Sequence, residues 1–163
     1  MCDIVKCMSH RRKKNMIRRY NYLKIHIKSE LETVNSLYEL ATNSGTLTNY
    51  DKIRVQESLK KSPQEKYLYK IIEIENKIDK EKEELISLYN AINSILIMLS
   101  EKDSYLIREL DINDKTLDQV ADTLKIKSLK YLSNKHYNAR KHFRNLQNKL
   151  YDFINGEYVE KNG

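Results

Sequence analysis

The sequence predicts an all-α fold, in which a long helical hairpin or coiled-coil arm is followed by a C-terminal tri-helical helix-turn-helix unit. Three glycines and one proline among 163 residues leave few obligatory turns. Apolar residues repeat every seven positions through much of the first hundred residues. Two helices with side-chain caps, separated by a short turn, then occur near the C-terminus.

The first predicted helix covers about residues 16–42. Two apolar rows with heptad spacing run along it, and Glu30 interrupts the second row. Residues 1–15 form a basic N-terminal tail, which can contact phosphate or simply be solvated. The apolar rows consist of Tyr20, Ile27, Val34 and Ala41, and of Met16, Leu23 and Leu37.

The second predicted helix covers residues 63–99, after a linker at residues 43–62. Ser62 and Glu65 have capping-box spacing, with a proline at the first helical position between them. The apolar stripe is broken only at Glu81, and it must be covered by the first helix, by a second copy in a homodimer, or by both. Its members are Ile71, Ile78, Leu85, Ile92 and Leu99, with Tyr67, Ile74, Leu88 and Ile95.

The predicted C-terminal tail covers residues 156–163, and the predicted helix-turn-helix unit covers residues 100–155. Its three helices are expected at roughly 101–110, 117–124 and 129–154. Ser100 begins the first of these helices as a cap, and the segment 111–115 after that helix is expected to be a loop.

Side-chain caps mark the next two helices as well. Thr116 is a good N-cap whose capping box is completed by Gln119, and Ser128 caps the last helix. His136 lies on the apolar side of that helix, where a core-facing histidine is the simple interpretation. The residues expected to pack together are Leu106, Leu110, Val120 and Leu124 against Leu132, Ala139, Phe143, Leu146, Leu150 and Phe153.

Positive charge is concentrated in two blocks, residues 1–30 and residues 125–155, and the second block coincides with the last predicted helix. Residues 125–155 contain eight Lys or Arg and one Asp or Glu, whereas residues 101–124 contain three and seven. Such polarity attracts phosphate to one face of a protein. A Lys-rich helix face can also be merely solvated, but its coincidence with the two capped helices favours DNA.

We therefore expect the residues that contact DNA to lie on the side of the last helix opposite its apolar row. The N-terminal turns of such a helix read base edges, where Lys pairs with guanine and Asn with adenine. The candidates for base contact are Lys130, Ser133, Asn134 and Tyr137. The candidates for phosphate contact are Lys127, Lys135, Lys141 and Arg144, with the backbone N–H groups behind Thr116 and Ser128.

No motif for catalysis or cofactor binding occurs in the sequence. It lacks GxxxxGK, HExxH and a nucleophile elbow, so we expect no enzyme, no catalytic residue, no cofactor and no metal site. It also lacks an apolar run long enough for a signal peptide or a membrane span, so we expect a cytoplasmic protein that does not contact a membrane.

Two resemblances follow from these residues. The segment from Thr116 to Leu146 resembles region 4 of sigma-70-type factors, although the turn 125–127 is one residue longer and lacks the usual glycine. Over roughly residues 20–150, the chain resembles short phage and prophage regulators of the RinA/ArpU type. The matching features are the linker sequence Tyr50-Asp51-Lys52-Ile53-Arg54-Val55-Gln56, the helix that opens near Pro63, and the spacing of Ser128, Leu132, His136 and Ala139.

The resemblance implies a sequence-specific DNA-binding regulator of phage or prophage late genes, acting in the cytoplasm of the bacterial host. Its implied partners are double-stranded DNA and, as a further candidate, host RNA polymerase. A different class of function remains open: the coiled-coil arm can be an interaction module that binds host RNA polymerase or a host defence protein.

Overall fold

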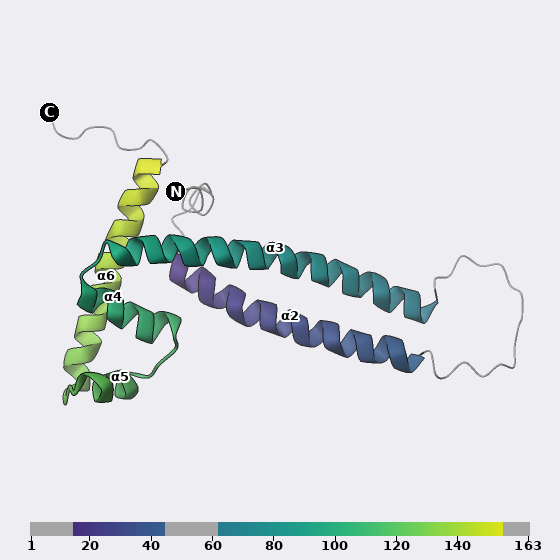
Figure 1. The fold of residues 1–163 in the computed structure, drawn as a ribbon, viewed down its shortest axis with the longest axis horizontal. Coiled ribbons are helices and arrows are strands. Elements are labelled where there is room, and N and C mark those ends of the chain that lie inside the picture. Colours follow the sequence, from purple (N-terminus) through teal and green to yellow (C-terminus); the bar gives the residue numbers. More distant parts are fainter. Residues whose placement is uncertain (1–14, 45–61, 155–163) are drawn as a thin grey trace, which may run out of the picture. The chain divides into compact units, whose positions relative to one another are not determined.

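The computed structural model describes residues 15–44 and 62–154, and all regular structure in these residues is helical (Figure 1). Three expected segments lie outside the described residues: the N-terminal tail at 1–15 apart from Asn15, the linker sequence at 50–56, and the C-terminal tail at 156–163. The predicted all-α fold, with a long hairpin followed by shorter helices that pack together, is confirmed. The helices are α2 (Met16–Ser44), α3 (Pro63–Ile97), α4 (Glu101–Ile107), the π-helical turn η1 (Arg108–Ile112), α5 (Leu117–Leu124) and α6 (Leu129–Ile154).

Two compact units are present among the described residues. The hairpin unit consists of residues 23–44 and 62–83, and the multi-helix unit consists of residues 15–22 and 84–154. Within each unit a part of α2 pairs with a part of α3. None of the described helices combines the length and hydrophobicity that crossing a lipid bilayer requires.

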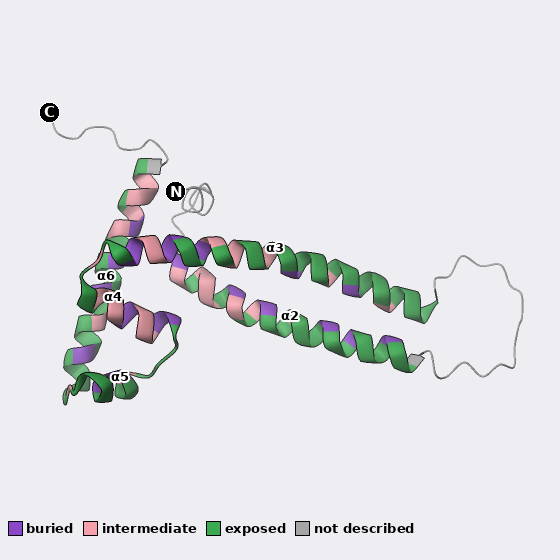
Figure 2. Cartoon of the chain, in the orientation of Figure 1, coloured by how far each residue is buried: buried purple, intermediate pink, exposed green. Residues whose placement is uncertain are grey.

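In the hairpin unit, α2 and α3 run antiparallel and bury their heptad stripes against each other (Figure 2). The antiparallel direction follows from the side-chain contacts, because Glu30 of α2 contacts Lys77 whereas Tyr38, further along α2, donates a 3.2 Å hydrogen bond to Glu75. The stripe of α3 is thus covered by α2 of the same chain, which is one of the arrangements that the sequence allows. The buried residues are Leu23, Ile27, Val34, Leu37 and Ala41 of α2 with Ile71 and Ile78 of α3.

The two glutamates that interrupt the heptad rows meet inside this hairpin. His26 Nδ1 lies 2.9 Å from Glu81 Oε2 and 3.6 Å from Glu30 Oε2. Lys77 pairs with Glu30, and its Nζ lies 3.9 Å from Glu81 Oε1. We call these four residues the polar cluster. A polar layer inside an apolar stripe is matched in only one alignment of the two helices, so it fixes their register.

The multi-helix unit is built around the last turns of α3 and the buried faces of α4 and α6. Arg19 in the first turns of α2 donates two 2.8 Å hydrogen bonds to Glu84 of α3, and the rings of Tyr20 and Tyr89 lie 6.0 Å apart between centroids. The α4 and α5 helices both pack on α6. The core residues are Met16, Leu88, Ala91, Ile92, Ile95, Leu96, Leu106, Ile107, Ile112, Val120, Ala121, Leu132, Ala139 and Phe143.

The predicted caps all form. Ser62 Oγ accepts the Glu65 N–H at 3.2 Å while the Glu65 side chain accepts the Ser62 N–H at 3.0 Å. Ser100 Oγ accepts the Asp103 N–H at 3.2 Å, and Thr116 forms its full capping box. These bonds satisfy backbone donors that the first turn of a helix leaves without partners, so they set where the helices begin.

The turn between α5 and α6 is closed by a left-handed residue. Lys125 has φ 54° and ψ 38°, and its N–H bonds to the Asp122 carbonyl at 3.2 Å. The Ile126 N–H then bonds to the Ala121 carbonyl at 2.9 Å, which completes a Schellman motif. Lysine here occupies the position that glycine usually takes, so the turn forms without the glycine of sigma factors.

The expected loop at residues 111–115 is wrong for its first two residues. The chain continues past α4 as η1, in which the Asn113 N–H bonds to the Arg108 carbonyl at 2.9 Å, five residues back. Asp111 and Ile112 are both buried in this turn. Ile112 belongs to the core and the charge of Asp111 is balanced by partners on α6, so neither residue faces solvent.

Two residues expected in the core are instead exposed. Leu124 is 40% exposed because it is the last residue of α5, beside the turn. Phe153 is 69% exposed in the last turn of α6, beyond Leu150. The apolar side of α6 is buried from Leu132 to Phe143 and becomes half-buried at Leu146 and Leu150.

Candidate nucleic-acid interface

The N-terminal turns of α6 carry the residues predicted to read bases. Ser128 caps the helix, because its Oγ accepts the Tyr131 N–H at 3.2 Å and its carbonyl accepts the Leu132 N–H at 3.1 Å. The helix therefore starts at a fixed residue, which determines the side chains that share a face over the next turns.

One exposed side of α6 contains most of the predicted contacts. The four base-contact candidates are all exposed, Tyr137 at 70%. Steps of three and four residues place them on one side of the helix, opposite the buried Leu132, Ala139 and Phe143. Two phosphate-contact candidates, Lys141 and Arg144, continue the same side. We call this exposed side the basic face, and it consists of Lys130, Ser133, Asn134, Tyr137, Lys141 and Arg144.

The remaining phosphate-contact candidates lie elsewhere. Lys135 lies on the flank of α6, where its Nζ is 5.4 Å from the centroid of the Tyr131 ring. Lys127 is exposed in the turn, next to the cap Ser128. Thr116 lies at the start of α5, where its N–H donates to Gln119 Oε1 at 2.9 Å and its hydroxyl accepts the Gln119 N–H at 3.3 Å. Both groups of Thr116 are thus committed to the cap.

The orientation of α6 depends on Asp111, which sequence reasoning missed. The Asp111 carboxylate is contacted by His136 Nε2 at 2.8 Å and accepts the Nε–H of Arg140 at 2.9 Å. Its backbone carbonyl accepts a 2.8 Å hydrogen bond from Asn21 of α2. This single residue joins η1 to α6 and to the first turns of α2. His136 faces the core, as predicted.

The environment of Asp111 stabilises its ionised form. Burial acts to raise the pKa of Asp111, but hydrogen bonds and charge from His136 and Arg140 outweigh burial and hold the pKa below its ordinary value. The same pairing raises the pKa of Arg140. The sequence does carry a signal for this site. His136 and Arg140 are one helical turn apart, and Asp111 directly precedes Ile112, an apolar residue that is buried although it lies in a polar stretch.

A neighbouring ion pair supports the chain between η1 and α5. Lys115 pairs with Glu109, and this hydrogen bond holds the pKa of Glu109 below its ordinary value although burial acts in the opposite direction. The Lys115 N–H also bonds to the Glu109 carbonyl at 2.9 Å. The connection that leads to Thr116 is therefore anchored to η1 by two bonds.

The polar cluster is the one group of at least three described residues with metal-ligand atoms close together. The ligand atoms of His26, Glu30 and Glu81 lie within 4.8 Å of one another, and imidazole with carboxylates can hold a divalent cation. The Lys77 ammonium already pairs with Glu30. Burial acts to raise the pKa of Glu30, but Lys77 and His26 outweigh it and lower that pKa. We therefore interpret the cluster as an ion-pair network.

Comparisons of the chain with protein-family models, with curated proteins and with solved structures gave no match. The resemblance to RinA/ArpU-type regulators therefore stays a prediction that rests on the residues quoted for it.

Proposed function

We propose that the protein is a sequence-specific DNA-binding transcriptional regulator, of the kind that phages and prophages use for their late genes. In this proposal α6 lies in the major groove and the basic face reads the DNA. The observation that carries the proposal is the position of Lys130, Asn134 and Tyr137 on one exposed side of a capped helix, opposite the core.

The charge distribution supports the proposal. Eight Lys or Arg and one Asp or Glu occur in residues 125–155, which contain α6 and the turn before it. The exposed carboxylates of α5, Asp118 and Asp122, favour the same orientation because they disfavour close approach of α5 to phosphate. Contacts to the DNA backbone are therefore assigned to Lys127, Lys141 and Arg144, which fix orientation without reading sequence.

The test begins with selection of bound duplexes from genomic fragments, followed by titration of the selected site. Replacing Lys130 and Asn134 together by Ala removes two base contacts, each worth about 1–3 kcal/mol of discrimination. We expect specific affinity to fall about 30-fold or more, since about 1.4 kcal/mol is tenfold. Binding to unrelated duplex DNA is expected to change much less.

The matched control is the double variant Asn145→Ala/Lys149→Ala. It removes the same two residue types at the same spacing from an exposed part of α6 about three turns beyond the N-terminal turns that are proposed to read bases. Circular dichroism checks that both double variants remain helical. Equal loss of specific binding in the two double variants, or unchanged binding of the first, would reject the basic face as the reading surface.

A second candidate function is docking of a host protein, such as RNA polymerase or a defence protein, on the hairpin unit. Large apolar side chains stay exposed there, including Ile25 at 72% and Ile72 at 54%. A partner retained by the tagged protein after nuclease treatment, and released by Ile25→Ser with Ile72→Ser, would support this function. A partner that leaves with the nucleic acid counts against it.

A further inference from the structure

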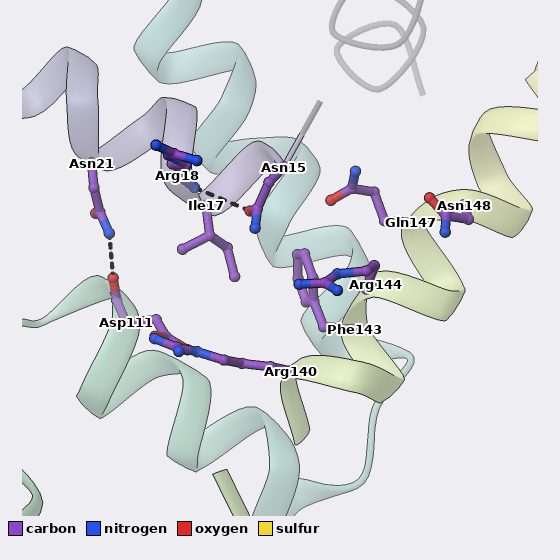
Figure 3. A pocket seen from close by; sticks show the side chains of 10 residues that line it. All are labelled: Asn15, Ile17, Arg18, Asn21, Asp111, Arg140, Phe143, Arg144, Gln147 and Asn148. Carbon is purple, nitrogen blue, oxygen red and sulfur yellow. Dashed lines mark hydrogen bonds and ion pairs between the residues drawn. The ribbon is translucent and has the colours of Figure 1, made fainter. Parts of the chain in front are cut away.

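A cavity of about 520 Å³ lies between the first turns of α2, η1 and α6 in the multi-helix unit. Figure 3 shows Arg140 extending from α6 to Asp111 of η1, while Arg144 and Phe143 of α6 and Ile17 of α2 line the same space. This volume falls in the range of small-ligand sites. We call it the arginine cavity.

The arginine cavity has positive charge that its lining does not balance. Three arginines and one acidic residue are among the described residues that line it. Asp111 is paired with Arg140. The guanidinium groups of Arg18 and Arg144 have no hydrogen bond or ion pair to any residue that the structure describes. Two positive charges therefore remain available to a ligand.

The walls of the cavity are held in place by hydrogen bonds. The Arg18 N–H donates to Asn15 Oδ1 at 3.1 Å, and Asn21 donates to the Asp111 carbonyl at 2.8 Å. Gln147, which is 6% exposed, accepts the Met16 N–H at 3.4 Å. Helix α2 is thus tied to η1 and α6 on either side of the arginines. A guanidinium is planar and offers paired donors, which suits the oxygens of a phosphate.

We propose that the arginine cavity binds a phosphate group, held by Arg18 and Arg144. In the DNA complex proposed above, on which this assignment rests, it is a backbone phosphate at the edge of the groove that α6 occupies. Arg144 follows Tyr137 by seven residues, so it lies about 10 Å further along α6. The major groove is about 12 Å wide, so a helix that reads bases near Tyr137 reaches the backbone near Arg144.

The DNA experiment measures how affinity falls with salt. Loss of one phosphate contact reduces the slope of log affinity against log salt concentration by about one. We expect this reduction in Arg18→Ala, because Arg18 belongs to α2 and lies outside the basic face. Lys149→Ala is the control, since it removes one exposed positive charge from α6 outside the cavity. Equal slopes for the two variants would overturn the assignment to a DNA phosphate.

The second experiment titrates the protein alone with inorganic phosphate, followed by the chemical shift of the phosphate ³¹P nucleus. Binding that is present in the wild type, absent in Arg18→Ala and retained in Lys149→Ala supports a cavity for a free phosphate ligand. If the wild type binds no duplex DNA, the proposed function fails, and this titration alone then decides whether the arginine cavity binds phosphate. Absence of both the slope change and phosphate binding overturns the inference.

Discussion

Asp111→Ala is expected to lower the free energy of unfolding by about 3 kcal/mol, at the lower end of the cost of breaking a buried ion pair. Asp111 is 5% exposed, and its removal leaves His136 and Arg140 without the acceptor that they share. The Arg140 side chain is 56% exposed, so water replaces part of its bonding, which places the cost at this lower end. Urea unfolding followed by circular dichroism measures the change.

The control is Asp122→Ala, which removes an exposed aspartate from α5 and should change stability by about 0.5 kcal/mol or less. A second control compares the stability of the wild type and of Asp111→Ala as the pH is lowered. Because the pKa of Asp111 in the folded protein lies below its ordinary value of 3.8, its stabilisation is complete well above pH 3.8 and is lost as pH falls through the folded pKa. The difference between wild type and Asp111→Ala should therefore shrink below pH 3.8. A difference that persists unchanged to pH 2 would contradict this account.

Ile95→Ala is expected to lower the free energy of unfolding by about 2–5 kcal/mol, the usual cost of truncating a buried isoleucine. Ile95 belongs to the heptad stripe of α3 and is 0% exposed in the core of the multi-helix unit. The cost has two parts: the transfer of the lost methyl and methylene groups, and the cavity that remains. Thermal and urea unfolding both measure it.

Ile97→Ala is a closely matched control, because it is the same substitution two residues further along α3. Ile97 is 79% exposed, so we expect a change within about 0.5 kcal/mol. Similar losses in the two variants would show that α3 does not bury the side of the helix described above. Specific DNA binding should fall in Ile95→Ala only in proportion to unfolding.

Features with local causes were predicted well from the sequence. The capping boxes at Ser62 and Thr116 involve residues three positions apart, so their spacing alone determines them. The stripes of α2 and α3 follow from apolar periodicity, and the exposed side of α6 is the complement of its apolar row. The same periodicity also accounts for the flank position of Lys135, because Lys135 follows Lys130 by five residues, which is about 140° around a helix and away from the basic face.

Features that depend on distant partners were not predicted. Asp111 was assigned to a loop because it lies in a polar stretch, and its partners are 25 and 29 residues further along the chain. In the sequence, Glu30 and Glu81 are two separate interruptions of two heptad rows. In the folded protein, both carboxylates lie next to the same His26 side chain. The arginine cavity likewise combines Arg18 with Arg144, which only the tertiary fold brings together.

The polar cluster also bears on how two copies of the chain can combine. A slipped pairing of α2 on α3 would bury Glu30 or Glu81 against an apolar residue, at the cost of an unpaired charge. A pair of chains that exchange their α2 helices would restore every contact among His26, Glu30, Lys77 and Glu81. The polar cluster therefore selects one alignment of α2 on α3, but it does not distinguish an α2 from the same chain from an α2 of a second copy. Which chain supplies α2 then depends on protein concentration against the effective concentration set by the covalent connection between the helices.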